Sequence, residues 1–119
     1  MTGFDNRAGF AFGDVVMIPY ALSDHRDVMQ RPGVVVSSRT YNQQRAEIVV
    51  MAITVQDRPN ASSGEMTIQD VEIAGLDQGA AFKPVLLTVE QKSVRLILGQ
   101  LNHRDRERLQ HLLRLILGT

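Results

Sequence analysis

Three side chains in the first half of the chain are of types that handle phosphate esters. Arg31 comes at the start of one predicted strand, and Thr54 lies near the end of the next. Because antiparallel neighbours place the start of one strand beside the end of the other, Arg31 and Thr54 are expected at the same rim of the sheet. His25 lies in the predicted loop that leads into Arg31. The pattern therefore predicts one polar cluster at the sheet rim.

Each of these groups has a role in cleaving a phosphodiester. An arginine can neutralise charge that grows on a pentacoordinate phosphorus, and a histidine can move a proton near neutral pH. A threonine can donate a hydrogen bond to a phosphate oxygen. The spacing alone leaves structural roles open: Arg31 could pair with Asp27, Thr54 could simply fill a strand position, and His25 could be a solvated loop residue.

The sequence lacks the residues or motifs that several other kinds of catalytic or binding site require. The chain has no cysteine, which excludes disulfides, thiolate metal sites and cysteine nucleophiles. The three histidines are His25, His103 and His111. No two of them are four residues apart and no HExxH motif is present, so the sequence lacks the spacing of a zinc site on a helix. We therefore expect no metal and no other cofactor. Phosphate-binding glycine loops (GxxxxGK[ST], GxGxxG) and the GxSxG nucleophile turn are also missing.

Length and charge restrict the class of protein. The 119 residues suit one domain, 1–119, and residues 1–12 are expected to form a loosely held arm. Thirteen basic residues balance thirteen acidic ones, so the chain lacks the strongly basic character of a duplex DNA-binding domain. Residues Val15 to Leu22 form the longest apolar run, far short of the roughly 20 residues that a membrane span needs. The first residues do not resemble an export signal, and a cytoplasmic location without membrane association is expected.

The pattern of apolar residues predicts a mostly β protein with one terminal helix. Branched residues, alternation and Pro/Gly-rich turns indicate strands over Asp14–Tyr20, Pro32–Ser38, Ala46–Val55, Met66–Ile73, Ala81–Val89 and Val94–Leu98. Polar segments connect them over Ser23–Gln30, Arg39–Arg45, Asp57–Gly64 and Leu76–Ala80. Pro19 suggests an edge position or a bulge, and the continuous apolar run Ile48–Met51 suggests a central strand.

The last segment changes to helical periodicity. Asn102 is a suitable N-cap and Gly118 a suitable C′ residue. Between them, a single apolar stripe is formed by Leu109, Leu112, Leu113, Ile116 and Leu117. The predicted fold class is β-rich α+β, a small and strongly bent antiparallel sheet or open barrel closed by the helix over 102–117.

A series of short motifs follows in order along the chain. These are Gly13-Asp14-Val15-Val16, Arg31-Pro32-Gly33-Val34-Val35-Val36-Ser37-Ser38, Tyr41-Asn42, Ala52-Ile53-Thr54, Ala74-Gly75-Leu76 and Leu98-Gly99-Gln100-Leu101. In the order and spacing of these motifs the chain resembles a known family, the PemK/MazF toxins of bacterial toxin–antitoxin systems. The resemblance covers about residues 12–118.

The resemblance implies an SH3-like barrel that forms a homodimer and cleaves single-stranded RNA at short sequences, without a metal. It also implies a partner antitoxin that holds the enzyme inactive. The family's catalytic arginine and threonine fall on Arg31 and Thr54, and His25 occupies the offset of a histidine that some members use. Further candidates for base or phosphate contact are Ser37, Ser38, Gln56 and Lys83.

The chain departs from the family pattern at three places. Ala52 stands where proline is common, Gly33 where alanine is common, and Pro84-Val85 where many members have an Asp-Gln pair. The missing aspartate leaves the second proton-transfer group and the RNA sequence recognised open. An alternative is a non-catalytic binding module that blocks a protein target such as DNA gyrase. A scaffold domain without either activity is the third possibility.

Overall fold

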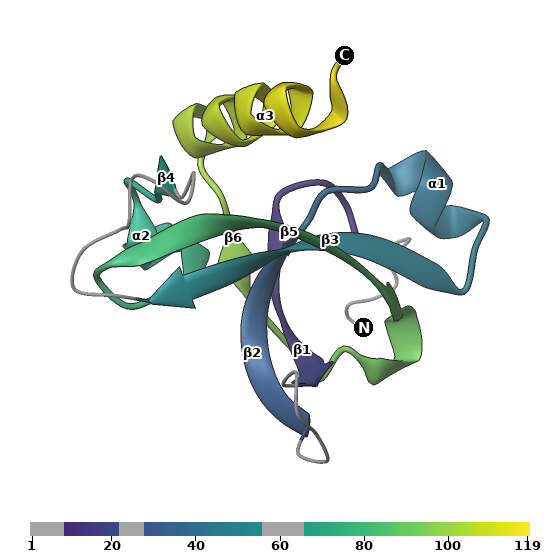
Figure 1. Ribbon diagram of the computed structural model, residues 1–119. Coiled ribbons are helices and arrows are strands. Elements are labelled where there is room, and N and C mark those ends of the chain that lie inside the picture. The colour runs from purple at the N-terminus through teal and green to yellow at the C-terminus, as the bar shows by residue number, and fades with distance from the viewer. Residues whose placement is uncertain (1–8, 22–27, 56–65) are drawn as a thin grey trace.

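The described residues form one curled antiparallel sheet with helices at its margins, as the computed structural model shows (Figure 1). The structure describes residues 9–21, 28–55 and 66–119. The strands are β1 (Asp14–Ala21), β2 (Val28–Val35), β3 (Glu47–Val55), β4 (Met66–Thr67), β5 (Ala80–Glu90) and β6 (Leu96–Gln100). The helices are α1 (Arg39–Gln43), α2 (Val71–Ala74), the 3₁₀ turn η2 (Gln91–Ser93) and α3 (His103–Leu117).

The strand order in the sheet is β4-β5-β3-β2-β1-β6. β3 is central, as the apolar run in its sequence predicts, and β1 lies between β2 and β6. Pro19 pairs with Gln30 of β2, but β6 pairs with β1 only from Asp14 to Met17. The missing amide of Pro19 therefore faces no neighbouring strand of the described sheet. β1 as a whole is an interior strand, and only the end that carries Pro19 is unpaired on one side.

Alternation along the strands builds two apolar cores, one on each face of the sheet. Val15, Val34 and Met51 belong to the larger core, together with Phe82 and residues of α2 and α3. The neighbouring positions Val16, Val35 and Val50 belong to the smaller core, with Ile18 and Ile48. The candidate site lies on the face of the smaller core, beyond Ile18.

The C-terminal helix is confirmed with the predicted caps. The Asn102 side chain accepts a hydrogen bond from the Asp105 amide (2.8 Å), and Gly118 ends α3 in the left-handed conformation. Leu109 and Leu112 are buried against the larger core, whereas Ile116 and Leu117 remain exposed. Only the first part of the predicted apolar stripe is covered within one chain.

This curled half-barrel with a C-terminal helix confirms the predicted fold class, but several boundaries differ. β2 begins at Val28, inside the predicted loop, and ends at Val35 rather than at Ser38. The predicted strand over 66–73 is only a two-residue strand followed by α2. Asp70 caps α2 and Gly75 ends it in the left-handed conformation, so a local helix replaces the second half of that strand. The segment over 39–45 contains the short helix α1.

Other predicted segments are only partly described. The predicted loop over 57–64 and residues 1–8 of the predicted arm lie outside the described residues. At the described end of that arm, Phe12 packs against the larger core and Phe10 against the smaller one. No helix among the described residues is long and apolar enough to cross a membrane.

Candidate active site

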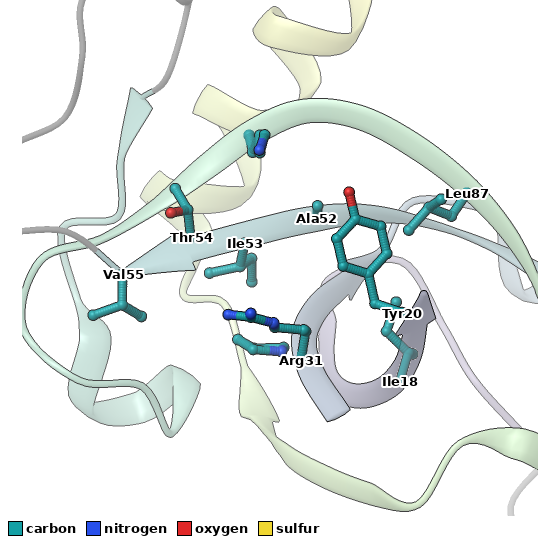
Figure 2. Close-up of a pocket in the computed structure, with 10 residues that line it drawn as sticks. Ile18, Tyr20, Arg31, Ala52, Ile53, Thr54, Val55 and Leu87 are labelled. Atoms are coloured by element: carbon teal, nitrogen blue, oxygen red, sulfur yellow. The ribbon is translucent and has the colours of Figure 1, made fainter. Parts of the chain in front are cut away.

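An open cavity of about 380 Å³ lies where β2 and β3 part from each other. These two strands pair only over Gly33–Val35 and Val50–Ala52. Beyond that point β2 continues alongside β1, and β3 continues alongside β5. The polar side chains at the strand ends therefore enter the space between the two pairs of strands (Figure 2).

Arg31 and Thr54 both line this cavity. The β2–β3 register ends with Gly33 opposite Ala52, and Arg31 and Thr54 each lie two residues beyond that pair, on the two sides of the opening. Figure 2 shows their side chains directed into the same space. The sequence analysis predicted this proximity, although β2 begins four residues before the predicted start at Pro32, so Arg31 lies within the strand rather than just ahead of it.

The Arg31 side chain is exposed. Its polar contact among the described residues is a long one, from Nη2 to Met29 Sδ (3.6 Å). No carboxylate of the described residues lies within salt-bridge distance of it. Asp27, the partner that the structural alternative assigned to Arg31, lies outside the described residues, as does His25.

Lys83 adds a second cation from β5. The β3–β5 register shifts here, because Met51 pairs with Leu86 whereas Ile53 pairs with Phe82. The extra β5 residues form a bulge that contains Pro84, and bulges are known to redirect side chains at such positions. The proline that departs from the family pattern therefore lies in the irregularity that brings Lys83 to the cavity.

Tyr20 is a lining residue that the sequence analysis missed. It follows Ile18 by two positions on β1, so both side chains share the face that carries the cavity. Its ring enters the cavity from the side opposite Thr54 (Figure 2). Alternation from the buried Ile18 could have identified this position, because it places residue 20 on the same face.

Ser37 and Ser38 do not line the cavity and instead hold the chain after β2. Ser37 is buried; its Oγ donates to Asn42 Oδ1 (2.6 Å) and accepts from the Val49 amide (3.0 Å). Ser38 caps α1 by accepting a hydrogen bond from the Tyr41 amide (3.1 Å). Gln56, the remaining candidate for RNA contact, lies outside the described residues.

The described side chains give the cavity an anion-binding character. Arg31 and Lys83 are cations, Thr54 and Tyr20 offer hydroxyl groups, and no described carboxylate lines the cavity. Nor do the described residues contain a group of three or more metal-ligating side chains. Together, the curled sheet and this cavity define a small protein whose site is suited to a phosphate ester.

Comparison with known proteins identifies the family of this chain. The model of the PemK-like, MazF-like toxin of type II toxin–antitoxin systems matches residues 11–117. The chain therefore belongs to the PemK/MazF toxin family. No curated protein matches the sequence.

Solved structures show the same fold. One is an endoribonuclease in complex with its cognate antitoxin from Mycobacterial species, with a TM-score of 0.72, 16% identity and coverage of 95% of this chain and 96% of that one. Another is a MazE–MazF structure from Deinococcus radiodurans, with a TM-score of 0.72, 17% identity and coverage of 92% and 96%. A MazF structure from the same organism has a TM-score of 0.70, 16% identity and coverage of 96% and 100%.

Proposed function

We propose that this protein is a metal-independent endoribonuclease that cleaves single-stranded RNA at specific short sequences and is neutralised by a cognate antitoxin. The observation that carries the proposal is the meeting of Arg31 and Thr54 in one open, cationic cavity. Family membership and the fold shared with an endoribonuclease support it.

The reaction begins with attack of a ribose 2′-OH on the adjacent phosphorus. It leaves a 2′,3′-cyclic phosphate on one fragment and a 5′-OH on the other. Arg31 stabilises the charge that develops on the phosphoryl oxygens, and Thr54 donates to one of them. His25 remains our proposed group for proton transfer, although it lies outside the described residues. A nuclease that needs the 2′-OH as nucleophile cleaves RNA and spares DNA.

The sequence offers four further candidates for RNA contact. Lys83 has the position for it, because it lines the same cavity as Arg31. Gln56 stays a candidate next to Val55, whose described side chain lies at the cavity wall. Ser37 and Ser38 stay candidates too, but their hydroxyls are already bonded within the protein. Single-stranded RNA fits an open cavity of this kind, since its unstacked bases expose their pairing edges.

We further propose a homodimer. At the end of α3, Leu115, Ile116 and Leu117 are 67%, 37% and 58% exposed. An apolar helix end of this kind is stabilised when a second copy covers it, and symmetric dimers are the commonest way to do so. Light scattering at high protein concentration should give twice the mass of one chain, and the mass of a single chain would contradict the dimer.

The decisive experiment incubates the purified protein with long single-stranded RNA in EDTA and maps the new ends. We expect cleavage at a short recurring sequence with 2′,3′-cyclic phosphate and 5′-OH termini. Arg31→Ala and Thr54→Val should lower the rate by about 100-fold or more, as expected when a transition-state contact is removed. Arg104→Ala and Thr88→Val are matched controls, since both residues are exposed and lie away from the cavity.

The same assay separates this proposal from its rivals. Intact RNA together with inhibition of DNA gyrase would favour the binding module, for which the missing carboxylate at residues 84–85 is the motivating observation. Intact RNA, active gyrase and no effect of overexpression on growth would favour a scaffold domain. Cleavage that disappears in EDTA would overturn metal independence.

A further inference from the structure

The proposed reaction needs a proton on the leaving 5′ oxygen, and the cavity contains a side chain that can supply it. Tyr20 and Arg31 lie on the same face of the β1–β2 pair: Arg31 pairs with Ile18, and Tyr20 is two residues further along β1. This makes them diagonal neighbours across the two strands, a spacing that long side chains can bridge. Both line the cavity.

The Tyr20 hydroxyl is not used to hold the fold together within the described residues. It makes no hydrogen bond to any described group, while its ring is half-buried among apolar neighbours that include Ile18 and Leu87. Figure 2 shows the ring entering the cavity with its hydroxyl at the far end. A half-buried ring whose hydroxyl is bonded to no described group is a rigid way to present a proton, because the side chain has only two rotatable angles.

The other described polar groups of the cavity suit this role less well. A guanidinium such as that of Arg31 does not give up its proton in proteins. An aliphatic hydroxyl such as that of Thr54 is a weaker acid than a phenol. Lys83 is exposed on the β5 bulge, where its ammonium acts as a point charge toward phosphate oxygens. A phenol keeps its proton at neutral pH and yields it readily to an alkoxide.

We propose that Tyr20 is the general acid of the proposed nuclease reaction. In this step, the 2′ oxygen bonds to phosphorus and loses its proton to the base of the proposed reaction, the role that remains for His25. The bond between phosphorus and the 5′ oxygen breaks, and that oxygen takes the phenolic proton of Tyr20. The phenolate then regains a proton from water and the base releases its own to water, so the enzyme is restored. This inference rests on the proposed function, and it assigns the proton-transfer group that the missing Asp-Gln pair left open.

The test compares two substrates with the same sequence. One is ordinary RNA, and the other carries a sulfur in place of the 5′ oxygen at the cleaved bond, a leaving group that needs no proton. Tyr20→Phe should lower kcat on ordinary RNA by about 100-fold or more, with KM unchanged, as expected for loss of a general acid. On the sulfur-containing substrate the variant should cleave at nearly the rate of the unaltered protein.

Two controls make the result specific. Tyr41→Phe changes the other tyrosine, which is exposed on α1 with the Arg45 guanidinium 4.8 Å from its ring centroid, and should have no effect on either substrate. Lys83→Ala should be equally slow on both substrates, because a charge contact does not depend on the leaving group. Thermal unfolding of each variant shows that the protein remains folded.

The outcomes separate the acid role from the proposed function. If the unaltered protein cleaves RNA and Tyr20→Phe is equally slow on both substrates, the ring only positions RNA and the acid role is overturned. If Tyr20→Phe cleaves ordinary RNA at the full rate, Tyr20 has no catalytic role. If the unaltered protein cleaves neither substrate, the proposed function itself fails.

Discussion

Arg31 of β2 and Thr54 of β3 line the same cavity, and each lies two residues beyond the Gly33–Ala52 pair with which the β2–β3 ladder ends. The two strands separate at this point because each follows a different neighbour, β1 on one side and β5 on the other. Backbone pairing up to Gly33 fixes the positions of both residues, while the separation leaves room between them for a ligand. The sheet therefore holds both groups at a cavity without burying either one.

This relationship predicts that arginine geometry matters at position 31. Arg31→Lys keeps the charge but replaces a planar, bidentate donor with a point charge. We expect the rate of RNA cleavage to fall by at least about tenfold, since two parallel hydrogen bonds to the phosphoryl oxygens are reduced to one contact. Single-turnover kinetics on a short RNA measure this, with Arg104→Lys on the exposed surface as the matched control. Equal rates for Arg31→Lys and the unaltered protein would show that only charge is required.

A second prediction concerns Asp105, a fully buried carboxylate at the start of α3. Its oxygens accept hydrogen bonds from the amides of Gln69 (3.0 Å) and Asp70 (2.9 Å) and from Arg108 Nη1 (3.1 Å). Asp105→Asn replaces one accepting oxygen with a donating amide group, which then faces another donor. We expect the free energy of unfolding to fall by about 1–3 kcal/mol, the cost of a buried unsatisfied group.

Urea denaturation measures that loss, and Glu107→Gln provides its control. Glu107 contacts His103 (3.2 Å), but both side chains are largely exposed, so we expect a change within about 0.5 kcal/mol. Similar effects for the two substitutions would show that the contacts of Asp105 do not stabilise the fold.

The sequence predicted the central part of the fold better than its margins. Strong local signals, such as the apolar run Ile48–Met51 and the caps Asn102 and Gly118, led to correct elements. The prediction of one strand over 66–73 was wrong, because the apolar residues of this segment fit both a strand and a short helix. Its conformation is decided by distant contacts, since Asp105 holds the backbone of Gln69 and Asp70. A local pattern cannot report such a contact.

The candidate site was predictable where it depended on strand pairing. Arg31 and Thr54 came together because neighbouring antiparallel strands require it. Tyr20 was missed although alternation places it on the same face as Ile18, because the sequence does not show that this face adjoins the cavity. Ser37 and Ser38 are a different case. The sequence alone does not distinguish a hydroxyl that contacts RNA from one that forms hydrogen bonds within the protein.

A third prediction concerns Gly99, at the contact between α2 and β6. Its backbone adjoins Ile73 and Ala74, and a Cβ added at Gly99 would lie 2.7 Å from the carbonyl carbon of Ala74. Because both partners are backbone, Gly99→Ala should displace α2 and lower the free energy of unfolding by about 3 kcal/mol or more. This contact gives a physical reason for two of the motifs that carry the family resemblance, since Gly75 adjoins the Leu98 backbone in turn.

Gly118→Ala is the contrasting control for this substitution. Gly118 has a φ of +72° but no atom within 4 Å of the added Cβ. The cost there is only that of a left-handed backbone, about 1–2 kcal/mol. Thermal or urea unfolding of both variants should rank Gly99→Ala as the more harmful, and the reverse order would contradict the close packing of α2 on β6.

The last prediction separates two roles for Ser37. If this serine contacted RNA, Ser37→Ala would raise KM and leave stability unchanged. In the structure the Ser37 hydroxyl donates to Asn42 Oδ1 and accepts from the Val49 amide, and Asn42 Nδ2 in turn donates to the Phe10 carbonyl (2.8 Å). Because the substitution leaves the part-buried Val49 amide and the buried Asn42 side-chain carbonyl without these partners, we expect a loss of about 1–3 kcal/mol in the free energy of unfolding.

The rate of RNA cleavage per folded molecule should stay unchanged in Ser37→Ala when measured well below its unfolding temperature. Ser93→Ala is a matched control, because Ser93 Oγ donates to the Glu90 carbonyl (2.7 Å) in an exposed setting where water can replace it. That control should cost less stability than Ser37→Ala and leave cleavage intact. A raised KM with full stability in Ser37→Ala would instead place RNA at the end of β2, and the substrate path would then extend well beyond the cavity at Arg31.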